Sequence, residues 1–210
     1  VQYSWLIEMC RTLFGFEGER LTVDNWEPLY DKSAEMMASP DWAELVLAKT
    51  KLESVFLTND FDDPLENFDT NLYIPCLRVD DLVFHLARPN VQERLAACTG
   101  VDVLNSATLK YAIGGLFQYF CSKNAKACAI SLPPDFSPTK ISDSRADTAI
   151  AALYAQKPDI DGAQRRAVAN FVFWTIAEYA AEFKLPFDLM IGVNRSVYPG
   201  GVHQGMDLYD

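Results

Sequence analysis

Four short apolar runs recur along the chain, and amphipathic segments separate the later ones. The runs are LESVFL (52–57), LYIPCL (72–77), KACAISL (126–132) and PFDLMIGV (186–193). Continuous apolar runs of this length predict strands of a sheet that is buried on both faces. Because helical patterns separate the later runs, the sequence predicts parallel βα units.

Helical patterns fill the first fifty residues and the two long intervals between later strands. In residues 2–14, apolar side chains recur at spacings of three and four. Ser39 as N-cap and Pro40 at the first helical position predict the start of another helix. Two longer helices are expected at 105–123, where two adjacent glycines weaken the pattern, and at 162–184. The expected inward positions of the last helix are Ala167, Phe171, Trp174 and Phe183.

The chain divides by pattern into a helical segment, residues 1–51, and a region of strands and helices, residues 52–210. The segment 131–148 is the one long stretch that reads as irregular, and it follows a predicted strand directly. Long loops after strands often carry function. No internal repeat or low-complexity linker separates the two parts, so a single domain is expected.

Polar clusters follow each of the four predicted strands. They are TNDFDDP (58–64), RVDD (78–81), SLPPD (131–135) and NRS (194–196). In parallel α/β folds the carboxyl ends of the strands converge, and ligands bind there. The four clusters therefore predict one shared pocket, although Asp, Asn, Ser and Pro are also ordinary turn residues.

Arg78 ends an apolar run, in a position where a surface turn needs no guanidinium. A rigid fork of five donors is suited to the carboxylate or phosphate of a ligand. The alternative is a structural ion pair, and both roles are compatible if nearby aspartates orient the arginine. The aspartates in question are Asp60, Asp62, Asp63, Asp80 and Asp81.

The amino-acid composition limits the classes of partner that the protein is expected to bind. The net charge of −11 argues against nucleic acid and against an anionic membrane surface, because both select basic patches. No run reaches the roughly 20 apolar residues of a membrane helix. Five cysteines without CxxC spacing predict free thiols, as expected for a cytoplasmic protein.

Metal binding receives little support from the residues themselves. The chain has two histidines, His85 and His203, which lie at no ligand spacing from each other or from a cysteine. His85 is expected to pack or to cap a helix, and His203 lies in a glycine-rich segment. The common hydrolase and nucleotide-binding motifs are absent.

The clusters at the strand ends, taken in order, resemble the uronate isomerases, a branch of the amidohydrolase superfamily. After one barrel strand that family has Thr-Thr-Asp-Asp-Pro, and TNDFDDP matches it with two extra residues. The next strand of the family ends Arg-Pro-Asp, and LRVDD keeps Arg78 and Asp80. QYSW (2–5) keeps Tyr3 and Trp5 of a His-Tyr pair followed by Trp.

A later family strand reads His-Ile-Gly-Ala-Leu-Arg-Asn, and MIGVNRS (190–196) keeps three of its residues, including Arg195. Two family histidines are replaced, by Gln2 and by Met190. Neither replacement can transfer a proton in acid–base catalysis. The Ser-Asp-His cluster of the family is not preserved clearly at 129–135.

The resemblance implies a TIM-type (β/α)8 barrel, of which this chain supplies about four parallel βα units after an N-terminal helical segment. Part of a longer chain is therefore expected, completed by its own further strands, by a complementing polypeptide or within a homo-oligomer. The implied activity is isomerisation of a hexuronate, D-glucuronate to D-fructuronate in type, through an enediol proton transfer. A divalent metal, zinc by resemblance, is implied for the complete enzyme, with its ligands outside this chain.

The resemblance also assigns roles to residues. Arg78 is expected to bind the uronate, with Arg195 and Asn194 as further substrate-binding candidates and Tyr3 as a catalytic candidate. Tyr3 is as readily explained as an aromatic on a helix packing face. Asp60, Asp62, Asp63 and Asp80 are expected to support the site. Two alternatives stay open: a metal-dependent hydrolase of the same superfamily, and a non-catalytic domain of that fold.

Overall fold

The computed structural model describes residues 2–156, 161–191, 193–195 and 205–207. The chain forms two compact units, Val1–Val55 and Phe56–Asp210. The division lies close to the boundary expected at residues 51 and 52; that the two units make one domain stays a prediction. No helix in the described part of the chain is long and apolar enough to cross a membrane.

The first unit consists of three helices, α1 (Gln2–Phe14), α2 (Trp26–Met37) and α3 (Trp42–Thr50). Only Ile7 and Cys10 of α1 are buried, and the apolar stripe that predicted this helix, including Trp5 and Met9, is largely exposed. Phe14 stacks on Trp42 with ring centroids 5.4 Å apart. This contact fastens α1 to α3.

Four parallel strands form the sheet of the second unit, as the sequence predicts. They are β2 (Asn59–Asp60), β4 (Cys76–Arg78), β5 (Ala127–Leu132) and β6 (Phe187–Ile191), hydrogen-bonded in that order. Strands β2 and β6 are the outer strands among those described. Closure of a barrel by further strands stays a prediction.

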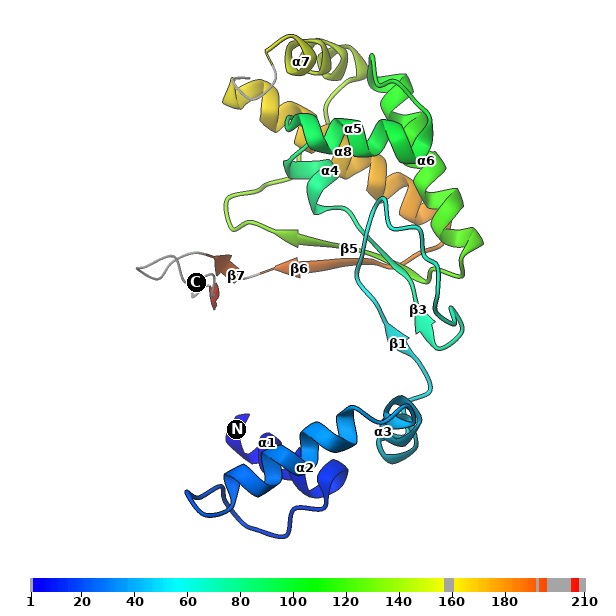
Figure 1. The fold of residues 1–210 in the computed structure, drawn as a ribbon. Coiled ribbons are helices and arrows are strands. Elements are labelled where there is room, and N and C mark those ends of the chain that lie inside the picture. Colours follow the sequence, from blue (N-terminus) through cyan, green and yellow to red (C-terminus); the bar gives the residue numbers. More distant parts are fainter. Residues whose placement is uncertain (1, 157–160, 192, 196–204, 208–210) are drawn as a thin grey trace. The chain divides into compact units, whose positions relative to one another are not determined.

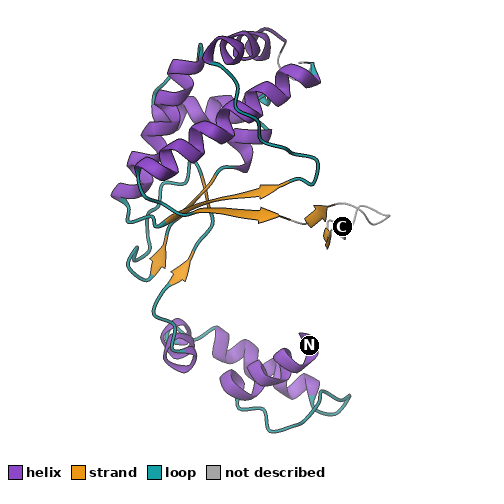
Figure 2. Ribbon diagram, turned by 180° about the vertical axis from the view of Figure 1, so that it is seen from behind, coloured by secondary structure: helices purple, strands orange, loops and turns teal. Residues whose placement is uncertain are grey.

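Helices cover one face of this sheet (Figures 1 and 2). The interval between β4 and β5 holds α4 (Asp80–Phe84), α5 (Pro89–Thr99) and α6 (Ser106–Ser122). The interval between β5 and β6 holds α7 (Asp143–Gln156) and α8 (Gly162–Glu182). Alternate residues of β5, namely Cys128, Ile130 and Leu132, enter the core below these helices. The sheet thus has one apolar face, and the prediction of burial on both faces is wrong for β6, where four of five residues are exposed.

Two strand predictions need correction. The run 52–57 does not form the edge of the parallel sheet; β1 (Val55–Phe56) pairs instead with β3 (Tyr73–Ile74), and β2 follows two residues later. The run 72–77 is broken at Pro75, which lies between β3 and β4. Proline lacks the N–H that a continuous strand requires, so the chain shifts partner there.

The sequence predicts the two long helices correctly, but it misplaces the start of α3 and does not predict α7. Helices α6 and α8 lie within the expected ranges, and Asn105 caps α6 by accepting a hydrogen bond from Thr108 N at 2.9 Å. Helix α3 begins at Trp42, two residues after the predicted start at Pro40, with Asp41 as N-cap. The segment expected to be irregular, 131–148, ends as the first six residues of α7. Of the inward positions expected for the last helix, Ala167 and Phe171 are buried, while Trp174 and the C-cap residue Phe183 pack against the core.

The five cysteines are free, as predicted. Burial raises the pKa of Cys128 to about 12 and that of Cys76 to about 11. These two thiols therefore stay protonated at neutral pH, which makes them core residues without nucleophilic reactivity.

The last pair of strands, β7 (Val193–Arg195) and β8 (Gly205–Asp207), forms an antiparallel ladder that follows β6. The continuous apolar run predicted as one strand over 186–193 is therefore split between β6 and β7.

The adjacent glycines of α6 occupy opposite environments. A methyl group on Gly114 would lie 2.7 Å from Tyr179 Oη and 2.9 Å from Tyr179 Cζ, whereas one on Gly115 meets no atom within 4 Å. The Tyr179 ring is held between Phe117 and Phe183, with centroids 5.7 and 6.3 Å away. Close approach of α8 therefore requires glycine at position 114 only.

We predict that Gly114→Ala and Gly115→Ala change stability in opposite directions. Alanine at 115 removes backbone freedom from the unfolded chain without a clash, which should raise the free energy of unfolding by about 0.5–1 kcal/mol. Alanine at 114 displaces the Tyr179 ring and should lower it by about 1–3 kcal/mol. Urea denaturation of the two variants measures both changes, and equal effects would contradict the assigned packing.

Candidate active site

The register of the parallel sheet places charged side chains in one row across it. Asp60 pairs with Arg78, Arg78 with Ala129, and Ala129 with Asp188. Partners in register point to the same face, opposite to Leu77 and Cys128, which face the helices. Asp60, Arg78 and Asp188 therefore share the face that the described helices leave uncovered, which corresponds to the interior of a closed barrel.

Arg78 is oriented by Asp80, two residues farther along the chain. Its Nε donates to Asp80 Oδ2 at 3.1 Å and its Nη2 donates to Asp80 Oδ1 at 3.4 Å. The Asp80 Oδ1 atom also accepts a bond from the backbone N–H of Ser131 at 3.2 Å, so β5 holds the carboxylate in place. The hydrogen bond with Asp80 raises the pKa of Arg78, which therefore keeps its charge throughout the physiological range.

One edge of the Arg78 guanidinium remains available. The Arg78 side chain is 42% exposed and its partner Asp80 only 18%. Among the described residues, no acceptor bonds to Arg78 Nη1. An arginine fixed on one side and open on the other is suited to receive an oxyanion of a ligand.

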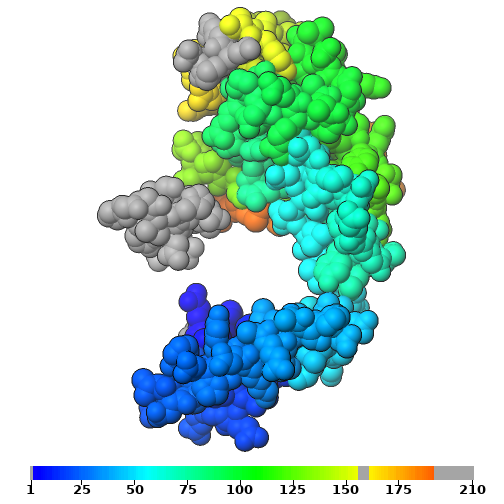
Figure 3. All heavy atoms as spheres, viewed as in Figure 1, coloured from blue at the N-terminus to red at the C-terminus, as the bar shows by residue number. Residues whose placement is uncertain are grey.

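A second arginine gathers the other aspartates. Arg94, from α5, forms a bidentate contact with Asp62, its Nε donating to Oδ2 at 2.7 Å and its Nη2 to Oδ1. The same guanidinium donates to Asp81 Oδ2 at 2.9 Å and to Asp60 Oδ2 at 3.3 Å, and it lies over the Phe61 ring, 4.7 Å from the centroid. Figure 3 shows the segment around β2 and its turn, in cyan, directly beside the green surface of α5. Arg94 thus joins three carboxylates from two strand ends.

Asp63 has a local structural role. Its Oδ1 accepts from the backbone N–H of Leu65 at 2.8 Å, and its Oδ2 accepts from Asn59 Nδ2 at 3.1 Å. Asn59 in turn accepts from Cys76 N at 3.3 Å, across the sheet. Asp63 therefore fixes the turn that follows β2 and links it to β4.

The structure brings together part of the predicted site. Arg78, Asp60, Asp62 and Asp80 lie at neighbouring strand ends. Among the described residues, Asp80 is the aspartate that pairs with Arg78, while Asp60 and Asp62 pair with Arg94. Asn194 and Arg195 lie in β7, and their side chains are outside the described part of the structure. His203 lies outside the described residues.

Tyr3 belongs to the first unit. Its side chain is about half exposed, and its hydroxyl oxygen accepts a hydrogen bond from the backbone N–H of Leu21 at 2.8 Å. This bond closes the loop between α1 and α2. A catalytic role for Tyr3 stays a prediction.

His85 occupies the C-cap of α4, in agreement with its expected capping position. Burial, together with the nearby Arg88, lowers its pKa. The imidazole is therefore neutral at physiological pH and joins neither arginine network.

Sequence reasoning missed two residues of the candidate site, Asp188 and Arg94. Asp188 lies inside an apolar run, where a lone acid signals a polar surface on one side of the strand. Arg94 lies in a helix, 32 residues from Asp62, and nothing in its local pattern indicates the three partners. Its signal was indirect: five aspartates at two strand ends require a nearby cation.

The described residues do not form a metal centre. No three His, Cys, Asp or Glu side chains among them are grouped to hold an ion. Asp60, Asp62 and Asp81, which share one partner, are each paired with Arg94. The residues present therefore do not fit the metal that the family resemblance implies.

Comparison with solved structures defines the fold of the chain. It is similar to glucuronate isomerase from Caulobacter crescentus (TM-score 0.83, 18% identity, 99% of this chain and 46% of that one). It is also similar to uronate isomerase from Thermotoga maritima (0.78, 13%, 98% and 48%) and to an uronate isomerase from Bacillus halodurans (0.62, 18%, 91% and 40%). No family model matches the sequence, and no curated protein matches it.

The fold class is therefore that of a TIM-type α/β barrel, represented here by four of its parallel strands. The particular barrel is the one found in uronate isomerases, which confirms the resemblance drawn from the sequence at the level of the fold. The chain spans less than half the length of each of these structures.

We predict that Arg94→Gln lowers the free energy of unfolding by about 2 kcal/mol at pH 7, because it leaves three carboxylates close together without their donor. Arg94 lowers the pKa of Asp62 from its ordinary value of 3.8. The contribution is thus complete above pH 3.8 and is lost as the pH falls through the lowered pKa. Urea denaturation from pH 7 to pH 2 should show the two proteins converging in acid.

Arg88→Gln is the matched control for this experiment. Arg88 is the exposed N-cap residue of the same helix, and among the described residues its side chain forms no ion pair. This variant removes the same charge and should leave stability within about 0.5 kcal/mol of the parent. A difference between Arg94→Gln and the parent that stays constant down to pH 2 would contradict the assigned ion pairs.

Proposed function

We propose that this chain forms the substrate-binding wall of an aldose–ketose isomerase that acts on hexuronates, D-glucuronate to D-fructuronate in type. The observation that carries the proposal is Arg78, held by Asp80 at a strand end with one edge of its guanidinium open. The fold shared with structures named glucuronate and uronate isomerases supports it. Catalysis by the complete protein is part of the proposal.

The substrate class follows from the charge of the site. A hexuronate carries a carboxylate at one end and a carbonyl at the other, so its recognition requires a fixed cation. Arg78 would bind the carboxylate, or an anionic oxygen that develops near it, through Nη1. Asp80 keeps the guanidinium in one orientation, which reduces the entropy lost when the sugar binds.

The other charged residues set the field around Arg78. Asp60 and Asp188 lie on its two sides in the row across the sheet, and an unneutralised Asp60 directly beside Arg78 would repel an anionic substrate. Arg94 binds Asp60, Asp62 and Asp81. These three carboxylates therefore do not compete with the substrate carboxylate for Arg78. Asp188 remains free to accept hydrogen bonds from sugar hydroxyl groups.

Isomerisation moves a proton between C2 and C1 through an enediol, which requires an acid, a base and stabilisation of the carbonyl oxygen. We assign none of the proton transfers to the described residues of the second unit. Tyr3, Asn194 and Arg195 are retained as further candidates for the site. The divalent metal implied by resemblance has its expected ligands outside this chain, and no step is assigned to it.

We predict that Arg78→Lys raises KM for D-glucuronate by about tenfold or more in the protein that contains this chain. Lysine keeps the charge but loses the two-point contact with Asp80 and the planar fork. Arg78→Gln, which removes the charge as well, should raise KM further. Steady-state kinetics of the two variants, monitored by formation of the keto sugar, measure both effects.

The exposed Arg88 again provides the control, since Arg88→Gln should leave KM unchanged. Unchanged unfolding curves for the Arg78 variants would show that the effect arises at the site. Parent-like KM in both Arg78 variants would remove this residue from substrate binding, and an absence of uronate turnover in the parent protein would refute the proposed activity itself.

A further inference from the structure

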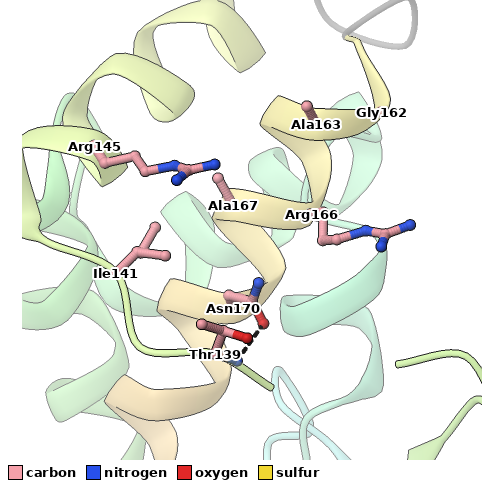
Figure 4. A pocket seen from close by; sticks show the side chains of 8 residues that line it. All are labelled: Thr139, Ile141, Arg145, Gly162, Ala163, Arg166, Ala167 and Asn170. Atoms are coloured by element: carbon pink, nitrogen blue, oxygen red, sulfur yellow. Dashed lines mark hydrogen bonds between the residues drawn. The ribbon is translucent and has the colours of Figure 1, made fainter. Parts of the chain in front are cut away.

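A cavity of about 470 Å³ opens between α7, α8 and the loop that follows β5 (Figure 4). Its lining combines apolar residues with a small set of polar groups, and none of the described lining residues is acidic. The volume lies in the range of small-molecule sites, which are commonly lined in this way. The lining residues are Thr139, Ile141, Arg145, Gly162, Ala163, Arg166, Ala167 and Asn170.

Asn170 is the buried polar group of this cavity, with only 6% of its surface exposed. Its Oδ1 accepts a hydrogen bond from the backbone N–H of Thr139 at 3.0 Å, which fixes the orientation of the amide. Among the described residues, Nδ2 has no acceptor. Figure 4 shows this nitrogen on the side of Ala167, away from the bond to Thr139. This nitrogen is not among the fully buried atoms that lack a partner, so it is open to the cavity and its two N–H donors are available to a ligand.

Arg145 supplies the charge. It extends from α7 toward α8, so that its guanidinium lies over the same cavity, whereas Arg166, which also lines the cavity, extends its guanidinium away from Arg145 (Figure 4). Within the described part of the chain, Arg145 forms no ion pair. The nearest acids in sequence are already engaged, since Asp143 pairs with Lys110 and Asp147 accepts a bond from Ser106 N. Arg145 thus gives this cavity a positive charge in a chain whose net charge is −11.

We propose that this cavity binds a small metabolite through an oxyanion, a phosphate or a carboxylate, held between the Arg145 guanidinium and the Asn170 amide. Both groups only donate hydrogen bonds at this point, and a guanidinium fork with an adjacent N–H matches the oxygen spacing of either anion. The apolar atoms of Ile141 and Ala167 provide contact for the rest of the ligand. This site is separate from Arg78 and does not depend on the proposed isomerase activity.

Binding would act on the loop between β5 and α7. Asn170 holds this loop at Thr139, and the same loop continues from β5, whose Ser131 N–H binds Asp80. A ligand that bridges Arg145 and Asn170 would therefore fasten α7 and the loop to α8.

The experiment is a titration of the ¹⁵N-labelled protein, followed by ¹H–¹⁵N correlation spectra. The probes are inorganic phosphate and succinate, each added at constant ionic strength because surface electrostatics is screened by salt. The expected result is a saturable shift of the Asn170 side-chain amide, accompanied by backbone amides near Thr139 and Arg145. Saturation by phosphate alone would assign a phosphorylated ligand, and saturation by succinate alone a carboxylate.

Two variants and a control decide the outcome. Arg145→Gln should raise the Kd for the probe about tenfold or more, through loss of charged hydrogen bonds. Asn170→Asp keeps the acceptor for Thr139 and places a carboxylate in the cavity, so saturable binding should disappear; if this variant does not fold, Arg145→Gln decides alone. Arg20→Gln removes an exposed charge in the first unit and should leave the Kd unchanged. Absence of a saturable shift with either probe, or equal Kd values for Arg145→Gln and Arg20→Gln, would overturn the proposal.

Discussion

The contact between Arg94 and the aspartates at two strand ends is the interaction on which the candidate site depends. Asp60 ends β2 and Asp62 lies in the turn after it, while Asp81 lies in the first turn of α4, which follows β4. Carboxylates this close would repel one another and compete for any cation nearby. Because Arg94 reaches all three from α5, the loop after β2 is fastened to the helix layer, and Arg78 has Asp80 as its single ion-pair partner among the described residues.

The two faces of the sheet differ in composition: one packs against the helices in the core, and the other carries the charged residues. Cys128, Ile130 and Leu132 pack against the helices, and with the aromatic residues of α6 and α8 they form one continuous core. The opposite face carries the row Asp60, Arg78 and Asp188. Since register in a parallel sheet fixes which side chains share a face, burial of the apolar set also determines where the charged set points. Packing of the core therefore positions the site.

The second unit has two sites that contain arginine, and they differ in whether carboxylates surround the guanidinium. Arg78 and Arg94 lie among acids, and both have their pKa raised by the carboxylates that they bind. Arg145 lies over a cavity without an acid among its described lining residues, next to a buried amide. The first arrangement orients Arg78 and leaves one edge of its guanidinium open, whereas in the second Arg145 is available for the anion that we propose. One chain can hold both because the Arg78 side chain lies on the uncovered face of the sheet, whereas α7 and α8 lie on the opposite side.

The sequence by itself determined the parallel α/β class, the long helices α6 and α8, and the position of Arg78 at a strand end. These features follow from the periodicity of apolar residues and from the positions where apolar runs end. Both are properties of residues that lie close together in the sequence. The boundaries near Pro40 and Pro75 and the helix α7 were misplaced, because capping and strand pairing depend on partners elsewhere in the chain. Only the tertiary structure decided that Arg94, not Arg78, binds Asp60 and Asp62, and that Arg145 and Asn170 face one cavity. Such pairs lie tens of residues apart, and the packing of helices onto the sheet alone brings them within reach.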